Sequence, residues 1–186
     1  MECNHFKGNV SVMTKRPAML AVSGVKNTGK TTLIEHLLPL LEKKGILTAV
    51  IKHDGHSFVP DTPGTDSFRF FAAGALCSAI YDREKFSLTC RAAVSEGKLA
   101  EFFPDADLIL LEGFKESAYP KLELVRKGIP SDPVCGLHTC IAIVSDLDLN
   151  TDLPLFHPDA AEDIAEFITV FLKGGITNDR QLRKND

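Results

Sequence analysis

"AVSGVKNTGKTTLIEHLL", which runs from Ala21 to Leu38, joins a short apolar run to a helical pattern through a loop that contains two glycines. Residues 24–31 fit GxxxxGK followed by Ser or Thr, the pattern of a phosphate-binding loop. Glycines at these positions let backbone N–H groups curl around a phosphate at a helix N-terminus, where the helix dipole favours negative charge. An ordinary glycine turn that caps a helix would not require Lys and Thr after the second glycine. The stretch therefore predicts a nucleotide-phosphate site between a strand and a helix.

The loop and one later strand together predict a magnesium site. Lys30 would reach the β and γ phosphates, and the Thr31 hydroxyl would bind Mg²⁺. Because Mg²⁺ takes oxygen ligands and keeps several waters, a carboxylate should lie at the end of a neighbouring strand. Glu112 fits, since it ends "LILLE", where a buried acid is costly unless it holds a water on the metal. The alternative is that Glu112 pairs with a basic residue at the sheet end; Asp107 is a weaker candidate because it begins that strand.

The remaining sequence alternates short β-branched and aliphatic runs with helical patterns, which is typical of a parallel sheet covered by helices. We expect an α/β fold of the P-loop NTPase type, with a mostly parallel sheet and helices on both faces. Helices are expected from the loop to Gly45, over 66–74 with Asp66 as N-cap, over 92–103, and after Asp159. Strands are expected at 19–23, 47–52 and 76–81, from residue 107, at 121–126 with alternating polarity, at 140–145 and at 154–156.

Length and composition favour one soluble domain. The chain has 186 residues, of which 44% are hydrophobic and 25% charged, and no apolar run approaches the roughly 20 residues that span a bilayer. We expect a flexible segment at 1–17, one nucleotide-binding domain over 18–173 and a disordered tail at 174–186. A net charge of −4 with scattered basic residues gives no electrostatic footprint for nucleic acid, and without a long apolar run we expect no membrane partner.

The N-terminus and the cysteines favour the cytoplasm. The first residues lack the continuous apolar segment of a secretory signal. Five cysteines without regular spacing fit reduced thiols better than a disulfide framework. Cys77, Cys90 and Cys140 lie in apolar contexts and are expected to be small buried side chains.

A polar segment follows the second expected strand, at the edge where ligands bind in open parallel sheets. "DTPG" at 61–64 imitates the DxxG switch of small GTPases, but no apolar strand ends at Asp61. The segment is either functional in another way or an ordinary Pro-Gly turn. Its charged and imidazole side chains are Lys52, His53, Asp54, His56, Asp61, Asp66 and Arg69.

Two smaller groups contain metal-ligand residue types. His53 with His56, and Cys135 with His138 and Cys140, could each hold a transition metal. Neither group has the paired spacing of a four-ligand zinc site. The sequence leaves both possibilities open.

Several segments, taken in order, resemble the MobB family of molybdopterin-guanine dinucleotide biosynthesis adaptor proteins. The resemblance covers about residues 18–172. It implies a GTP-binding, slowly hydrolysing α/β protein that forms a homodimer. It also implies that the chain assists a MobA-like nucleotidyltransferase, which joins GMP from GTP to molybdopterin. The segments are "GVKNTGKTT" (24–32), "VIKHDGHSF" (50–58), "DTPGTDSFR" (61–69), "AAGA" (72–75), "DLILLEGFK" (107–115) and "PKLELVR" (120–126).

The resemblance also suggests site residues. Lys30 and Glu112 are the catalytic candidates, and Thr31 and Glu112 would hold Mg²⁺. Lys26 is not the signature lysine of the related dimeric ATPases, which directly follows the first glycine. Ser145-Asp146 ends an apolar strand where a base-binding Asp could lie, although a full NKxD signature is missing. The nucleotide-binding candidates are Gly24, Lys26, Asn27, Thr28, Gly29, Lys30, Thr31, Thr32, His53, Asp61, Asp66 and Arg69.

Two other functions are alternatives to the adaptor role. A P-loop small-molecule kinase or ATP-dependent ligase would need a mobile basic lid over the transferred phosphate. Arg69, Arg83 and Arg91 are the only loosely grouped candidates for such a lid. A metal-delivery GTPase would instead use the His and Cys groups.

Overall fold

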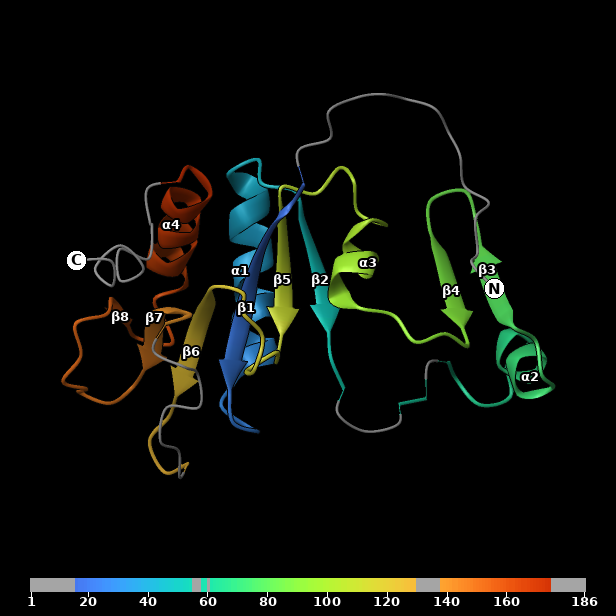
Figure 1. Ribbon diagram of the computed structural model, residues 1–186, viewed down its shortest axis with the longest axis horizontal. Coiled ribbons are helices and arrows are strands. Elements are labelled where there is room, and N and C mark those ends of the chain that lie inside the picture. Colours follow the sequence, from blue (N-terminus) through green and yellow to red (C-terminus); the bar gives the residue numbers. More distant parts are fainter. Residues whose placement is uncertain (1–15, 55–57, 60, 130–137, 175–186) are drawn as a thin grey trace, which may run out of the picture.

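The computed structural model describes residues 16–54, 58–59, 61–129 and 138–174. Its main element is a six-stranded sheet in the order β2-β5-β1-β6-β7-β8, in which all neighbouring strands are parallel (Figure 1). The predicted α/β fold with a mostly parallel sheet is thereby confirmed. The strands are β1 (Ala18–Gly24), β2 (Thr48–Lys52), β5 (Leu108–Glu112), β6 (Lys121–Val125), β7 (Cys140–Ser145) and β8 (Leu155–Phe156).

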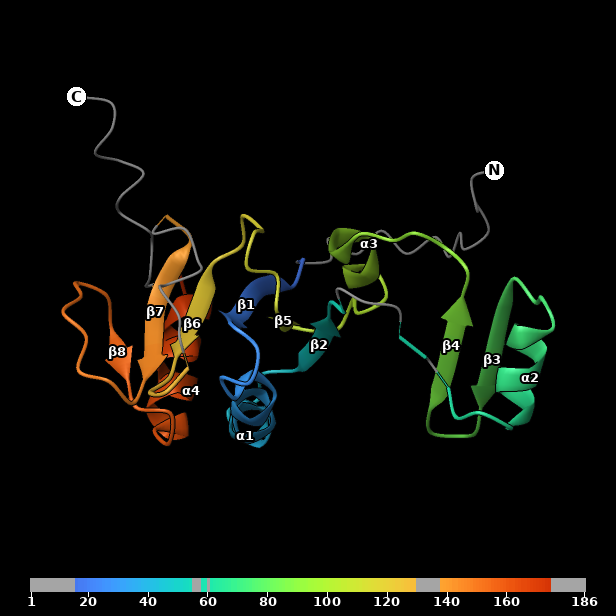
Figure 2. The same cartoon turned by 90° about the horizontal axis from the view of Figure 1, so that it is seen from below.

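Helices cover both faces of this sheet, as the sequence predicts. Figure 2 shows α1 (Lys30–Lys43) and α4 (Ala161–Leu172) on one side and α3 (Glu96–Ala100) on the other. The larger core cluster lies on the side of α1 and α4, and a smaller one contacts α3. Apolar runs such as β5, which is buried at every position, are what a sheet covered on both faces requires.

A smaller antiparallel unit lies beyond β2 and α3 (Figures 1 and 2). It consists of α2 (Asp66–Ala72) and a hairpin of β3 (Cys77–Tyr81) and β4 (Phe86–Cys90). The sequence reading missed β4. Its signals are the alternating "FSLTC" and a turn at Asp82, whose Oδ1 accepts the backbone N–H groups of Glu84 at 2.8 Å and Lys85 at 2.9 Å.

The hairpin corrects the prediction for two cysteines. Cys77 and Cys90 lie directly opposite each other on β3 and β4 and form a disulfide, and both residues are exposed. The expectation of buried, reduced thiols is wrong for this pair because β4, which brings them together, was not recognised. Cys140 is buried and free, as expected.

Three local predictions also need correction. The N-cap of α2 is Thr65 rather than Asp66, because the Thr65 hydroxyl accepts the Phe68 backbone N–H at 3.3 Å. The helix expected over 92–103 is only the five residues of α3. The strand expected to alternate at 121–126 is buried throughout β6, because it lies between β1 and β7.

Burial of Lys121 in β6 is possible because its ammonium group is fully hydrogen-bonded. It donates to the backbone oxygens of Ser117 and Tyr119, the latter at 2.9 Å, and to the Thr139 hydroxyl at 3.2 Å. These hydrogen bonds reduce the free-energy cost of moving the ammonium group from water into the protein interior.

The expected domain boundaries fall near the two ends of the described part of the chain. The predicted flexible segment 1–17 and tail 174–186 lie outside the described residues, apart from residues 16, 17 and 174.

Candidate functional site

The phosphate-binding loop connects β1 to α1 at the carboxyl edge of the sheet (Figure 1). Gly24 has φ +143°, and a Cβ there would lie 2.6 Å from the Leu124 backbone oxygen. Gly29, which caps α1, has φ +89°. Asn27 also has a positive φ of 67°, a conformation that Asn tolerates better than most residues. The loop backbone therefore has positive φ angles at Gly24 and Gly29, as expected for glycines at these positions.

Lys30 lies against the carbonyl groups of this loop. Its Nζ donates to the oxygens of Gly24 at 3.1 Å and Val25 at 2.7 Å. Partial burial lowers the pKa of Lys30, while the nearby Glu112 carboxylate opposes that shift. An ammonium group has three N–H donors, so one more can be directed to a phosphate oxygen.

Glu112 lies beside the start of α1, as the sequence predicts. Its Oε1 accepts a hydrogen bond from the Thr31 hydroxyl at 2.9 Å and forms an ion pair with Lys52 Nζ at 3.0 Å. The register explains this cluster, because Glu112 of β5 pairs with Val22 of β1 and with Lys52 of β2. A hydroxyl and a carboxylate are hard oxygen donors of the kind that Mg²⁺ prefers, so the residues present fit that ion.

The proposed alternative for Glu112, pairing with a basic residue, is also part of the site. Lys52 is that residue, and its side chain is 58% exposed while that of Glu112 is 11% exposed. The sequence reading named Lys52 among the polar side chains after β2 but gave it no role. The parallel pairing of β2 with β5 is the signal that identifies it.

Arg126 and Asp146 border the loop on the opposite side of β1 from Glu112. Arg126 follows β6 and Asp146 follows β7, and Arg126 Nε donates to Asp146 Oδ2 at 3.1 Å. The Nη1 atom of Arg126 is 3.6 Å from the position that a Cβ on Gly29 would take. Sequence reasoning missed Arg126, although it ends one of the family-like segments.

His53 follows β2 next to Glu112. Its backbone N–H donates to the Glu112 carbonyl oxygen at 3.3 Å, and its ring lies 5.5 Å from that of Phe114. The structure thus places His53 at the same sheet edge as the loop. Lys26, Asn27, Thr28 and Thr32 belong to the loop or to the first turn of α1, with Lys26, Asn27 and Thr32 exposed and Thr28 buried.

Asp61, Asp66 and Arg69 lie in the smaller unit instead. Figure 1 shows α2 beside the hairpin, separated from the loop by β5, β2 and α3. Arg69 forms an ion pair with Asp66 at 3.3 Å on the exposed surface of α2. Within one chain the structure does not bring these three residues to the loop, so their part in nucleotide binding stays a prediction.

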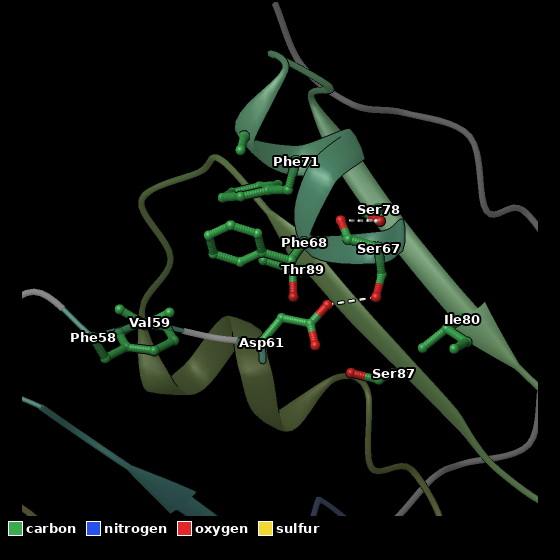
Figure 3. Close-up of a pocket in the computed structure, with 11 residues that line it drawn as sticks. Phe58, Val59, Asp61, Ser67, Phe68, Phe71, Ser78, Ile80, Ser87 and Thr89 are labelled. Carbon is green, nitrogen blue, oxygen red and sulfur yellow. Dashed lines mark hydrogen bonds between the residues drawn. The ribbon is translucent and has the colours of Figure 1, made fainter. Parts of the chain in front are cut away.

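Asp61 faces a pocket between α2 and the hairpin (Figure 3). Its carboxylate accepts the Ser67 hydroxyl at 2.5 Å and the Thr62 backbone N–H at 2.7 Å. The Ser67 bond, and after it the Thr62 bond, hold the pKa of Asp61 below its usual value. Phe68 and Phe71 form an aromatic wall of the same pocket.

The structure describes only part of the residues on which the two competing functions depend. No group of three potential metal ligands occurs among the residues that the structure describes, and His56 and Cys135 lie outside them. Arg91, a candidate for a kinase lid, lies 4.1 Å over the Phe71 ring and donates to the Phe71 carbonyl oxygen at 2.6 Å. It therefore stabilises the smaller unit.

In the described part of the chain, no helix has the length and apolar character of a membrane span.

Known proteins resemble this chain over most of its length. Residues 19–146 match the family model of MobB, described as molybdopterin guanine dinucleotide synthesis protein B. The molybdopterin-guanine dinucleotide biosynthesis adapter protein of Escherichia coli is 33% identical over 164 residues, which are 83% of this chain and 93% of that protein. A probable adapter protein of the same description from Bacillus subtilis is 31% identical over 84% of this chain and 94% of its own length.

A solved structure gives the same result for the fold. The crystal structure of Bacillus subtilis MobB superposes with a TM-score of 0.65 at 30% identity, covering 83% of this chain and 97% of that one. The resemblance seen in the sequence is confirmed, and the chain belongs to the MobB family.

Proposed function

We propose that this protein is a nucleotide-dependent adapter that binds GTP with Mg²⁺ and assists the attachment of GMP to molybdopterin in the cytoplasm. The observation that carries the proposal is the 2.9 Å contact between Thr31 of the phosphate-binding loop and Glu112 of β5. It pairs the two oxygen donors that a magnesium-nucleotide complex needs. The relatives named above supply the molybdopterin-guanine dinucleotide context.

The groups of the site have different roles in this proposal. The loop N–H groups and Lys30 hold the phosphate oxygens, and Thr31 with Glu112 holds the metal. Bound Mg²⁺ would neutralise phosphate charge. Lys52 pairs with Glu112 and so keeps a positive charge beside this carboxylate.

The adapter role is favoured over phosphoryl transfer by the positions of the basic residues. Arg91 is bound to Phe71, and Arg69 to Asp66, in the smaller unit. This unit lies beyond β2 and α3, away from the loop after β1 (Figure 1). The positions of the two arginines in the described part of the chain therefore favour an adapter with slow hydrolysis over a transfer enzyme that closes them over the phosphate.

The smaller unit provides a surface for a homodimer. Leu76, Tyr81 and Phe86 are 72%, 83% and 74% exposed, and a two-stranded sheet is marginally stable without a covering layer. A second copy of this chain is the proposed cover. Phe86→Ser should then shift the protein from dimer to monomer in sedimentation analysis, whereas Phe102→Ser, at a 62% exposed residue near α3, should not.

The function is tested with purified protein and a MobA-like nucleotidyltransferase. We expect binding of GTP and GDP with Mg²⁺ by calorimetry, loss of binding in Lys30→Ala, and faster formation of the dinucleotide cofactor from molybdopterin and GTP when the protein is added. Lys43→Ala is the matched control, because Lys43 is an exposed lysine at the opposite end of α1. Absence of nucleotide binding at millimolar concentrations would overturn the proposal.

A further inference from the structure

Different residue types lie on the two sides of the phosphate-binding loop, and this difference gives a bound nucleotide a preferred orientation. Strand β5 with Glu112 lies on one side of β1, and β6 with Arg126 lies on the other. Mg²⁺ bridges the β and γ phosphates of a nucleoside triphosphate. If the metal end lies at Thr31 and Glu112, as the proposed function requires, the opposite flank of the loop, toward β6 and β7, is the one that we assign to the nucleoside end.

The side chains at that end form a fixed pair. Asp146 Oδ1 accepts the Lys127 backbone N–H at 2.8 Å, and Oδ2 accepts Arg126 Nε at 3.1 Å. The parallel pairing of Val125 with Ser145 places the next residue of each strand side by side, which is why these two meet. The hydrogen bond from Lys127 is the main cause of the lowered pKa of Asp146, so the carboxylate is ionised at neutral pH.

Both side chains remain accessible to a ligand. The Arg126 and Asp146 side chains are 35% and 26% exposed. Each carboxylate oxygen can accept a second hydrogen bond, and no other hydrogen bond involves the Nη groups of Arg126 among the described residues. Because Nη1 lies 3.6 Å from the Cβ position of Gly29, the guanidinium reaches over the loop itself.

We propose that Arg126 and Asp146 form the base-reading part of the nucleotide site and select guanine. The Asp146 carboxylate accepts the N1–H and the 2-amino group of guanine. Adenine has an acceptor at N1 and no 2-amino group, so it would leave the carboxylate unpaired and face it with a lone pair. Arg126, held flat by its bond to Asp146, packs its guanidinium plane against the base.

The test exchanges the hydrogen-bonding character of Asp146. Asp146→Asn replaces an acceptor by an N–H₂ donor, which suits the 2-oxo group of xanthine. Calorimetric titrations with GDP, ADP and xanthosine diphosphate, all with Mg²⁺, would compare the wild type and the variant. We expect the wild type to prefer GDP over ADP, and the variant to lose about tenfold in GDP affinity while it gains xanthosine diphosphate binding.

A second variant tests the arginine with a matched control. Arg126→Ala should weaken GDP binding, whereas Arg16→Ala, which removes the same charge from an exposed residue before β1, at the opposite edge of the sheet, should not. Urea unfolding of each variant confirms the fold. Unchanged GDP preference in Asp146→Asn, or wild-type GDP affinity in Arg126→Ala, would overturn the inference.

Lys30→Ala separates this inference from the proposed function. If the wild type binds nucleotide through Lys30 but Asp146→Asn keeps its GDP preference, the base-reading role alone fails. If the wild type binds no nucleotide at all, the nucleotide-dependent function itself fails, and the base-reading role fails with it.

Discussion

The hydroxyl group of Thr31 lies 2.9 Å from a carboxylate oxygen of Glu112, although the two residues are 81 positions apart. Parallel pairing explains the contact: Glu112, the last residue of β5, is level with Val22 of β1, and the loop then returns the chain to Thr31. The carboxyl ends of parallel strands meet at one edge, so this edge collects the oxygen donors.

Removal of the negative charge at Glu112 should weaken the metal part of the site. In Glu112→Gln, we expect the Mg²⁺ concentration that supports GDP binding to rise by about 10- to 100-fold, while binding without Mg²⁺ changes little. A magnesium titration monitored by a fluorescent GDP analogue measures this. Glu116→Gln, at an exposed residue of the following loop, is the control. Equal magnesium dependence in the wild type and Glu112→Gln would contradict the assignment.

A Cβ atom at Gly24 should distort the phosphate-binding loop. In Gly24→Ala the new atom would meet the Leu124 backbone oxygen at 2.6 Å and Thr28 Oγ1 at 2.9 Å. We expect a loss of about 1–3 kcal/mol in unfolding free energy, together with weaker nucleotide binding. Urea titration and calorimetry measure the two effects.

Gly97→Ala is the matched control for that substitution. Gly97 lies in α3, and nothing is within 4 Å of its Cβ position. Because alanine favours helix, its unfolding free energy should stay the same or rise slightly. A similar loss of unfolding free energy in both variants would show that the loss in Gly24→Ala does not come from the backbone conformation of Gly24.

The larger core should depend on buried β5 side chains. Leu110 is completely buried between the strands and helix α1, so Leu110→Ala should lower the unfolding free energy by about 2–5 kcal/mol. Leu47→Ala, at a residue that is 58% exposed, should change it by less than about 0.5 kcal/mol. Urea unfolding followed by circular dichroism would distinguish them, and equal losses would contradict this assignment of the core.

Glu112 could be placed from the sequence because two simple rules coincide there. "LILLE" is apolar enough to be a central strand, and a carboxylate at its end must face the same edge as the loop after β1. No knowledge of side-chain direction was required. The same reasoning failed to find Arg126, because its contact with Asp146 depends on a register irregularity between β6 and β7 at Lys121 and Leu122.

The smaller unit was less predictable, for a physical reason. Asp61, Asp66 and Arg69 follow β2 in sequence, which suggested that they share its edge of the sheet. Packing of α2 on β3, seen in the 3.2 Å bond from the Ser78 hydroxyl to the Ser67 carbonyl oxygen, carries them away from it. The hairpin has short strands with exposed apolar residues, a weak pattern that single-sequence reasoning does not resolve.

Cys140 should be the least reactive thiol among the described cysteines once the disulfide is reduced. Burial, with a contribution from Glu123, raises the pKa of Cys140 to about 11, so its reactive thiolate is scarce at neutral pH and rises roughly tenfold per pH unit below that value. Cys77 and Cys90 are exposed on the hairpin. Iodoacetamide labelling after reduction, read by peptide mass spectrometry, should modify those two first at pH 8. Cys140 should react only in urea or as the pH approaches 11, and labelling of all three at equal rates in the folded protein would show that β7 does not bury this thiol.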